Sequence, residues 1–269
     1  MSSGPQSFPL SRLSQLPRRD VIAISISLGG IVVLAWWYLF ALSTNMVMPM
    51  PSASSGNGVM ATMTVPDWNV AYFAAMFLMW SIMMIGMMLP SVTPTVMIYS
   101  LVAKKAAREG SQVAPTSAFV SGYVVVWIGF SLVATAGQYF LDQADLLTAM
   151  MASNSQVLGG SLLLVAGAWQ FSPLKEQCLQ HCRSPFDFIS RYWKRGVIGA
   201  SGMGIRHGLV CLGCCWALMA LLFVGGVMNL LWIAILSVFV LLEKVLPWAE
   251  KSARLTGSVM LVIGLIILL

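Results

Sequence analysis

The sequence predicts an all-α protein, a polytopic bundle of about seven transmembrane helices. Of its 269 residues, 58% are hydrophobic and only 9% are charged. A soluble domain typically carries about 25% charged residues, so this chain has too few to cover a water-exposed surface. Its apolar residues also gather in runs close to the ~20 residues that a helix needs to cross the hydrocarbon core of a bilayer. The lipid bilayer is therefore the first partner that the sequence predicts.

Seven apolar runs qualify as spans, and polar or charged residues separate them. The first follows Arg18 and Arg19 and is longer than the core of a secretory signal peptide, which indicates an uncleaved anchor. The second ends at Pro90 and Pro94, which each remove a helical hydrogen bond and force a kink or a stop. The glycine-rich stretch 196–206 is interpreted as an interfacial or re-entrant segment before the fifth span. The predicted spans are 21–42, 69–89 with an extension towards 101, 117–140, 155–172, 207–225, 227–242 and 255–269.

The basic residues lie on one side of these spans. Every Lys and Arg except Arg206 precedes the first span or lies in the loops after the second, fourth and sixth spans, whereas loops 43–68, 141–154 and 225–227 contain none. The positive-inside rule then makes the N-terminus cytoplasmic, and we expect a bacterial inner (plasma) membrane. Basic residues distributed in this way form no continuous face or stripe, so no nucleic-acid partner is predicted.

Two regions are expected along the chain. Residues 1–20 include a stretch rich in Ser, Pro and Gln and are predicted to form a mobile cytoplasmic N-terminal segment. Residues 21–269 are predicted to form a single transmembrane helical domain, because no stretch between the spans is long and mixed enough to fold as a separate soluble domain.

All cysteines and histidines of the chain lie between residues 178 and 215. Thiolate and imidazole are the side chains that bind soft and borderline metals best, so their confinement to one stretch predicts a metal or thiol site. A disulfide is not expected on the cytoplasmic side, because that compartment is reducing. The candidate ligands are Cys178, His181, Cys182, His207, Cys211, Cys214 and Cys215.

Helical spacing brings these candidates into two groups. If the fourth span continues as a helix, Cys178, His181 and Cys182 share one face. His207, Cys211 and one of the next two cysteines share a face of the fifth span in the same way. The two groups are expected to meet at the cytoplasmic membrane boundary. Arg206, at the edge of this span, is expected to pair with Glu243 or to reach the lipid headgroups.

Methionines form two further groups. Thioethers suit Cu(I), but methionine is also a flexible residue that fills gaps in helix packing, so both roles stay open. One group is a stripe at helical spacing in the second span, and the other is a Met-x-Met-x-Met run in the loop that follows the first span. The candidate secondary contacts are Met46, Met48, Met50, Met76, Met79, Met83 and Met87.

Four stretches, 80–94, 169–185, 204–219 and 243–247, carry a distinctive combination of residues. They contain Met-Met-Leu-Pro-Ser, Trp-Gln-Phe-Ser-Pro-Leu-Lys before the first cysteines, Cys-Leu-Gly-Cys-Cys-Trp, and Glu-Lys before a proline. Together they resemble the DUF2182 family of predicted metal-binding integral membrane proteins, over about residues 69–250. The resemblance implies a polytopic membrane protein with a metal site, and copper handling is the role usually proposed for the family.

The preferred hypothesis is a protein that binds Cu(I) and hands it to a copper-receiving membrane protein or complex. No enzyme is expected, because the sequence contains no nucleotide-binding glycine-rich loop, no His-Glu-x-x-His and no credible Ser/His/Asp set. Because thiols must lose their protons to bind metal, copper affinity should fall with acid. Three alternatives stay open: a membrane subunit of a larger complex with a structural or vestigial site, in which Zn replaces copper; a metal transporter; and a thiol oxidoreductase that uses the Cys-x-x-Cys pair.

Overall fold

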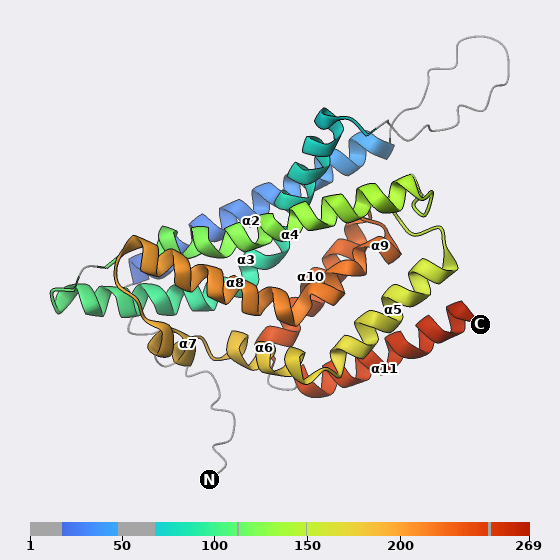
Figure 1. Ribbon diagram of the computed structural model, residues 1–269. Helices are drawn as coiled ribbons and strands as arrows, with labels where there is room; N and C mark the ends of the chain where they lie inside the picture. The colour runs from blue at the N-terminus through green and yellow to red at the C-terminus, as the bar shows by residue number, and fades with distance from the viewer. Residues whose placement is uncertain (1–17, 48–67, 112, 149, 247–248) are drawn as a thin grey trace.

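The computed structural model describes residues 18–47, 68–111, 113–148, 150–246 and 249–269, and helices make up most of this part of the chain (Figure 1). Most of the predicted N-terminal segment and of the loop with Met48 and Met50 lies outside the described residues, as does the side chain of Met46. The helices are α2 (Arg18–Val47), α3 (Val70–Arg108), α4 (Thr116–Gln143), α5 (Gln156–Gln170), α6 (Pro173–Arg183), α7 (Pro185–Tyr192), α8 (Gly196–Ala220), α9 (Leu222–Gly225), α10 (Leu230–Val245) and α11 (Ala249–Leu268).

The all-α class is confirmed, and each predicted span overlaps a helix. Within the described residues, four helical segments are long and apolar enough to cross a membrane: Arg18–Thr44, Val70–Arg108, Thr116–Gln143 and Gly196–Gly225. The pair α5 and α6, bent by 64° at its break, makes a fifth candidate span. The last two predicted spans correspond to the shorter helices α10 and α11. The chain is thus an integral membrane protein with four or five candidate spans.

Helix α3 runs through both of its prolines, where the sequence predicted a kink or a stop. Pro90 and Pro94 lie inside the 39-residue helix, and the ribbon changes direction along its length (Figure 1). Two hydroxyls beside the prolines bond back to the same helix: Ser91 Oγ donates to the Met88 carbonyl at 2.8 Å and Thr93 Oγ1 to the Leu89 carbonyl at 2.9 Å.

Helix α8 also differs from expectation at its start. It begins at Gly196 and continues without a break to Ala220, so residues 196–206 are part of the helix and not a separate re-entrant or interfacial segment. The reason is close packing against α4. A Cβ atom on Gly204 would lie 2.0 Å from the Phe119 carbonyl oxygen, and one on Gly122 would lie 2.1 Å from the Ser201 carbonyl oxygen. The glycines therefore let the two backbones touch, as small residues do between membrane helices.

This contact makes a direct prediction. The Gly204→Ala variant must push α4 and α8 apart, because the new methyl group meets backbone atoms that cannot rotate away. We expect it to lower the free energy of unfolding in detergent micelles by about 1–3 kcal/mol, the usual range for overpacking. The matched control is Gly202→Ala on the same helix, where nothing lies within 4 Å of the added atom. Equal stability of the two variants would contradict the packing argument.

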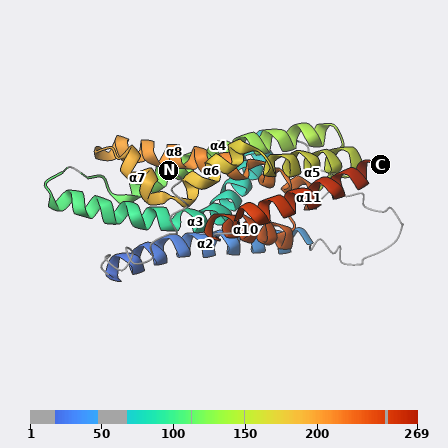
Figure 2. The same ribbon diagram turned by 90° about the horizontal axis from the view of Figure 1, so that it is seen from below.

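A second pair of helices packs through glycines spaced seven residues apart. Gly160 and Gly167 of α5 face Gly264 and Gly257 of α11, where an added Cβ would meet a carbonyl oxygen of the opposite helix at 2.9 to 3.2 Å. Figures 1 and 2 show these two helices side by side from both directions, with α2 along the opposite edge beside α3. The α5–α11 pair therefore holds the start of α6 in place, and α6 carries the first two cysteines.

Candidate metal centre

Helix α6 brings the first cysteines to α8. Helix α5 ends at Gln170, and α6 begins at Pro173. The side chain of Ser172 caps α6, and Pro173 occupies its first turn, a combination typical of helix starts. The resulting 64° bend turns α6 away from the axis of α5 and places it against α8. The fourth predicted span therefore does not continue straight through the cysteines. The break instead places Cys178 and Cys182 beside α8.

Five thiols from the two helices gather here, and we call them the thiol cluster: Cys178, Cys182, Cys211, Cys214 and Cys215. Cys211 lies at the centre, because the thiols of Cys182, Cys214 and Cys215 each interact with its thiol. Cys182 also interacts with Cys214. The Cys211 carbonyl accepts hydrogen bonds from the sulfurs of Cys214 and Cys215, both at 3.0 Å. The cysteines predicted from two separated stretches are thus brought together.

Cys178 reaches the cluster from the other side, over Gly213. Its thiol lies near Cys214, and a Cβ built on Gly213 would be 2.9 Å from Cys178 Sγ. The Trp169 indole N–H donates to the Gly213 carbonyl at 3.2 Å, which holds the end of α5 at the same point. The absence of a side chain at residue 213 therefore leaves room for the Cys178 sulfur against α8.

The Gly213→Ala variant tests this contact. The added methyl group must displace the Cys178 sulfur, since a Cβ atom does not approach a non-bonded sulfur to 2.9 Å in folded proteins. If Cys178 is a ligand, we expect Cu(I) affinity to fall several-fold, measured by competition with a chromogenic Cu(I) chelator. Gly129→Ala on α4 is the control, because nothing lies within 4 Å of its added atom. Unchanged affinity in Gly213→Ala would remove Cys178 from the ligand set.

Three polar side chains from other helices surround Cys211. Lys244 Nζ of α10 donates to Cys211 Sγ at 2.9 Å and to Ser91 Oγ of α3 at 3.0 Å. The Tyr123 hydroxyl of α4 lies 3.0 Å from Cys211 Sγ and 3.3 Å from the Met88 carbonyl oxygen. Helices α3, α4, α8 and α10 therefore all supply groups to the surroundings of one sulfur atom. Tyr123, Lys244 and Ser91 were not among the predicted site residues.

The two histidines have different places. His207 is buried one turn before Cys211, with Nε2 3.4 Å from Thr95 Oγ1. Within the described residues its Nδ1 is buried and has no hydrogen-bond partner, so that nitrogen is free to bind a ligand. His181 instead lies on the exposed face of α6, where its Nδ1 contacts the Gln177 carbonyl oxygen at 2.8 Å. It lines a separate surface hollow with Asp187 and Arg191 of α7.

A buried ion pair fixes α6 on α10 beside the cluster. Lys175 Nζ contacts both carboxylate oxygens of Glu243, at 2.8 and 2.9 Å, and also the amide oxygen of Gln170. The expected pairing of Glu243 with Arg206 is therefore wrong. Arg206 stacks over the Tyr192 ring, with its guanidinium carbon 3.7 Å from the ring centroid. Lys175 lies in the first turn of α6, beside the end of α10 that carries Glu243, and so it pairs with this carboxylate in place of Arg206.

The three cysteines of α8 lie in the second half of the helix. Because α8 begins at Gly196, Cys211 to Cys215 lie roughly 22 to 28 Å along the helix axis, at a rise of 1.5 Å per residue. They are thus beyond the middle of the helix and not near its start. All three cysteines of α8 are at most 2% exposed, whereas Cys178 and Cys182 are half-buried. Access to the cluster is therefore from the α6 side.

The methionines of α3 are buried in the core of the bundle. Met76, Met79, Met83 and Met87 are at most 4% exposed, and Met84 and Met88 beside them are fully buried. They pack with residues of the same core that contains the α8 cysteines. This burial agrees with packing, and their role as secondary metal contacts stays a prediction.

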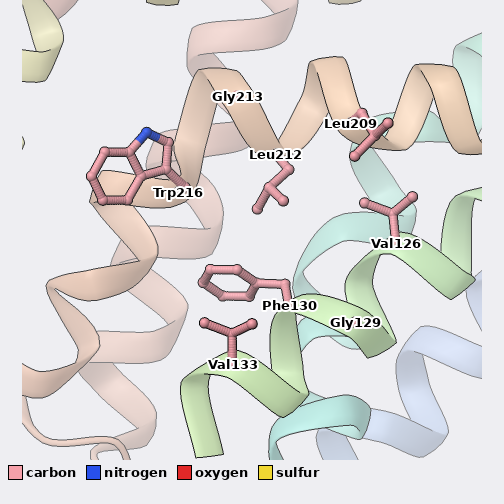
Figure 3. A pocket seen from close by; sticks show the side chains of 8 residues that line it. All are labelled: Val126, Gly129, Phe130, Val133, Leu209, Leu212, Gly213 and Trp216. Atoms are coloured by element: carbon pink, nitrogen blue, oxygen red, sulfur yellow. The ribbon is translucent and has the colours of Figure 1, made fainter. Parts of the chain in front are cut away.

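The thiols are close together but do not form a finished site. Among the residues that the structure describes, no group of three or more His, Cys, Asp or Glu side chains is arranged so that it could hold a metal ion. The sulfur atoms point to one another and to backbone carbonyls, so binding a metal requires them to rotate. An apolar hollow between α4 and α8 lies nearby (Figure 3) but carries no metal ligand. It is lined by Val126, Gly129, Phe130, Val133, Leu209, Leu212, Gly213 and Trp216.

Comparison with known proteins gives a match to a family model. A family model described as PpoB2, copper chaperone, matches residues 77–267, and DUF2182 is the former name of that family. No curated protein and no solved structure matches the chain. The matched region begins in the first turns of α3 and ends near the end of α11, so it contains every cysteine and histidine. Because the match covers more than half of the chain, the protein belongs to the PpoB2 family of copper chaperones, which carry copper and are not enzymes.

Proposed function

We propose that this membrane protein binds Cu(I) at the thiol cluster and hands it to a copper-receiving membrane protein or complex. One observation carries the proposal: Cys182 of α6 interacts with the thiols of both Cys211 and Cys214 of α8. Soft thiolate ligands select Cu(I), and a cluster shared by two helices offers more sulfurs than a single ion needs. Spare sulfurs allow ligand exchange, which is how an ion leaves without passing through an unliganded state.

The proposed ligands differ in accessibility. Cys211, Cys214, Cys215 and His207 are buried in α8, and Cys178 and Cys182 on α6 are half-buried. We propose that the α6 thiols receive or release the ion and that the α8 thiols hold it. His181, on the outer face of α6, would assist at the surface step. The buried methionines of α3 and the Met46, Met48 and Met50 group would provide weaker contacts along the way.

The orientation belongs to the same proposal. The basic loops predict that the N-terminus, α6 and α7 face the cytoplasm of a bacterial inner membrane. Lys194, Arg195 and Arg191 lie near the end of α7 and the start of α8, in agreement with a cytoplasmic surface at that end. Residues 21–269 would then form one transmembrane domain.

Elemental analysis of the purified protein tests the proposal. Wild type from copper-supplemented cells should contain stoichiometric copper, and a Cys211→Ser/Cys214→Ser variant should have lost it. Stoichiometric zinc in place of copper would contradict the proposal in favour of a structural site. Protein without metal, in which a cysteine pair cycles between oxidised and reduced forms, would contradict it in favour of a thiol oxidoreductase. Copper accumulation inside vesicles would indicate a transporter.

A further inference from the structure

The buried ammonium group of Lys244 is a feature that copper binding alone does not explain. Lys244 is only 9% exposed, and its Nζ contacts Cys211 Sγ at 2.9 Å and Ser91 Oγ at 3.0 Å. Within the described ranges, no carboxylate oxygen lies within 4.0 Å of Lys244 Nζ, the limit for an ion pair. Its neighbour Glu243 is already bound by Lys175. A positive charge is thus held at the thiol cluster without a carboxylate partner.

A buried charge without a partner is strongly unfavourable, so its counter-charge must come from the groups beside it. The groups within its electrostatic reach that can carry a negative charge are the sulfurs of Cys211, Cys214 and Cys215 and the Tyr123 hydroxyl, and the His207 ring is also within reach. Of these, the sulfurs are the ones that become anionic when they bind a metal, because a metal ligand must be a thiolate. Lys244 therefore acts on the net charge of the metal–thiolate complex.

We propose that Lys244 makes the site selective for a monovalent ion. For any fixed number of thiolates, the complex of Cu(I) carries one more negative charge than the complex of a divalent ion such as Zn²⁺. A fixed ammonium group close to the central sulfur stabilises the more negative complex more strongly. The positive charge therefore favours binding of Cu(I) over binding of a divalent ion. This inference rests on the proposed binding of Cu(I) by the thiol cluster and adds a determinant of specificity.

The size of the effect follows from the distance. With one positive charge about 4 to 6 Å from the metal, an effective dielectric constant near 20 gives an electrostatic preference of about 100- to 1,000-fold in affinity. The Lys244→Met variant should lower Cu(I) affinity by about 100-fold or more and lower the ratio of Cu(I) to Zn²⁺ affinity by a similar factor. A merely structural lysine would change both affinities together and leave their ratio unaltered.

The experiment uses the full-length protein in detergent, with Cu(I) and Zn²⁺ affinities measured separately by competition with chelators. Lys244→Arg keeps the charge and should retain the wild-type ratio. Lys244→Gln keeps hydrogen-bonding capacity towards Ser91 and Cys211 but removes the charge, so it should lose selectivity as Lys244→Met does. It also serves as the test variant if Lys244→Met does not fold. A wild-type ratio in a folded Lys244→Gln variant would overturn the inference.

The two proposals fail in different ways. If Cys211→Ser/Cys214→Ser binds Cu(I) as tightly as wild type does, the thiol cluster is not the binding site and the proposed function fails first. If this double variant loses Cu(I) while Lys244→Gln keeps the wild-type ratio of affinities, the proposed function stands and only the role of Lys244 is rejected.

Discussion

Replacing Cys211 by serine is expected to lower Cu(I) affinity by more than about 100-fold. Cys211 is the sulfur that Cys182, Cys214 and Cys215 all contact, and it is the one that Lys244 reaches. Substitution of groups that only support a metal ligand typically lowers affinity about 10- to 100-fold, so the loss of this central ligand should exceed about 100-fold. Competition with a chromogenic Cu(I) chelator measures the difference directly.

The control for this variant is Met203→Leu on the same helix. Met203 is 2% exposed and belongs to the core, and leucine conserves its volume, so copper affinity and folding should stay near wild type. Cys211→Ser should also remain folded, because serine is close to cysteine in size. Wild-type affinity in Cys211→Ser would show that Cys211 is not a required ligand, and equal losses in both variants would indicate general disruption of α8.

Removing Lys175 should destabilise the protein more than any other single substitution considered for this bundle. Lys175 is 2% exposed and Glu243 is 3% exposed, so Lys175→Met leaves a carboxylate buried without a partner. Breaking a buried ion pair in this way typically costs about 3–5 kcal/mol. Because the pair also holds α6 on α10, we expect Cu(I) affinity to fall as well. Denaturation in mixed micelles measures the first effect, and chelator competition the second.

Two further variants isolate the cause. The double variant Lys175→Met/Glu243→Leu removes both charges and should recover most of the lost stability, since apolar residues of similar volume can replace a buried pair. Lys104→Met breaks the Lys104–Asp20 pair, whose side chains are 47% and 24% exposed. That change should cost at most about 1 kcal/mol, as is usual for surface pairs. A double variant no more stable than Lys175→Met would contradict the charge argument.

Much of the fold was predictable because lipid imposes a simple rule on sequence. A membrane helix must be long and apolar, and each of the seven predicted runs does overlap a helix. What the runs did not reveal is where one helix bends into another. The break between Gln170 and Pro173 depends on a serine cap and a proline, and these local signals looked like an ordinary span end. The fourth predicted span therefore ended at residue 172, with only a straight continuation of its helix through Cys178 considered, so the bend was not predicted.

The candidate site was predicted in its cysteines but not in its surroundings. Cysteine is rare, so its confinement to residues 178–215 was visible without any structure. Lys175 and Lys244 were read as loop residues, because long basic side chains at span ends normally reach the headgroups. Their burial follows from partners on other helices, which sequence spacing within one helix does not show. Tyr123 carried no signal that distinguished it from other aromatic residues of α4.

The central claim is that one copper ion is bound by sulfurs from both α6 and α8. X-ray absorption at the copper edge of protein loaded with one equivalent of Cu(I) tests it most directly, in wild type and in Cys182→Ser. The account predicts a first coordination shell made mainly of sulfur in wild type, with fewer sulfur ligands in the variant. A first shell of nitrogen and oxygen, or a sulfur shell that Cys182→Ser leaves unchanged, would contradict it.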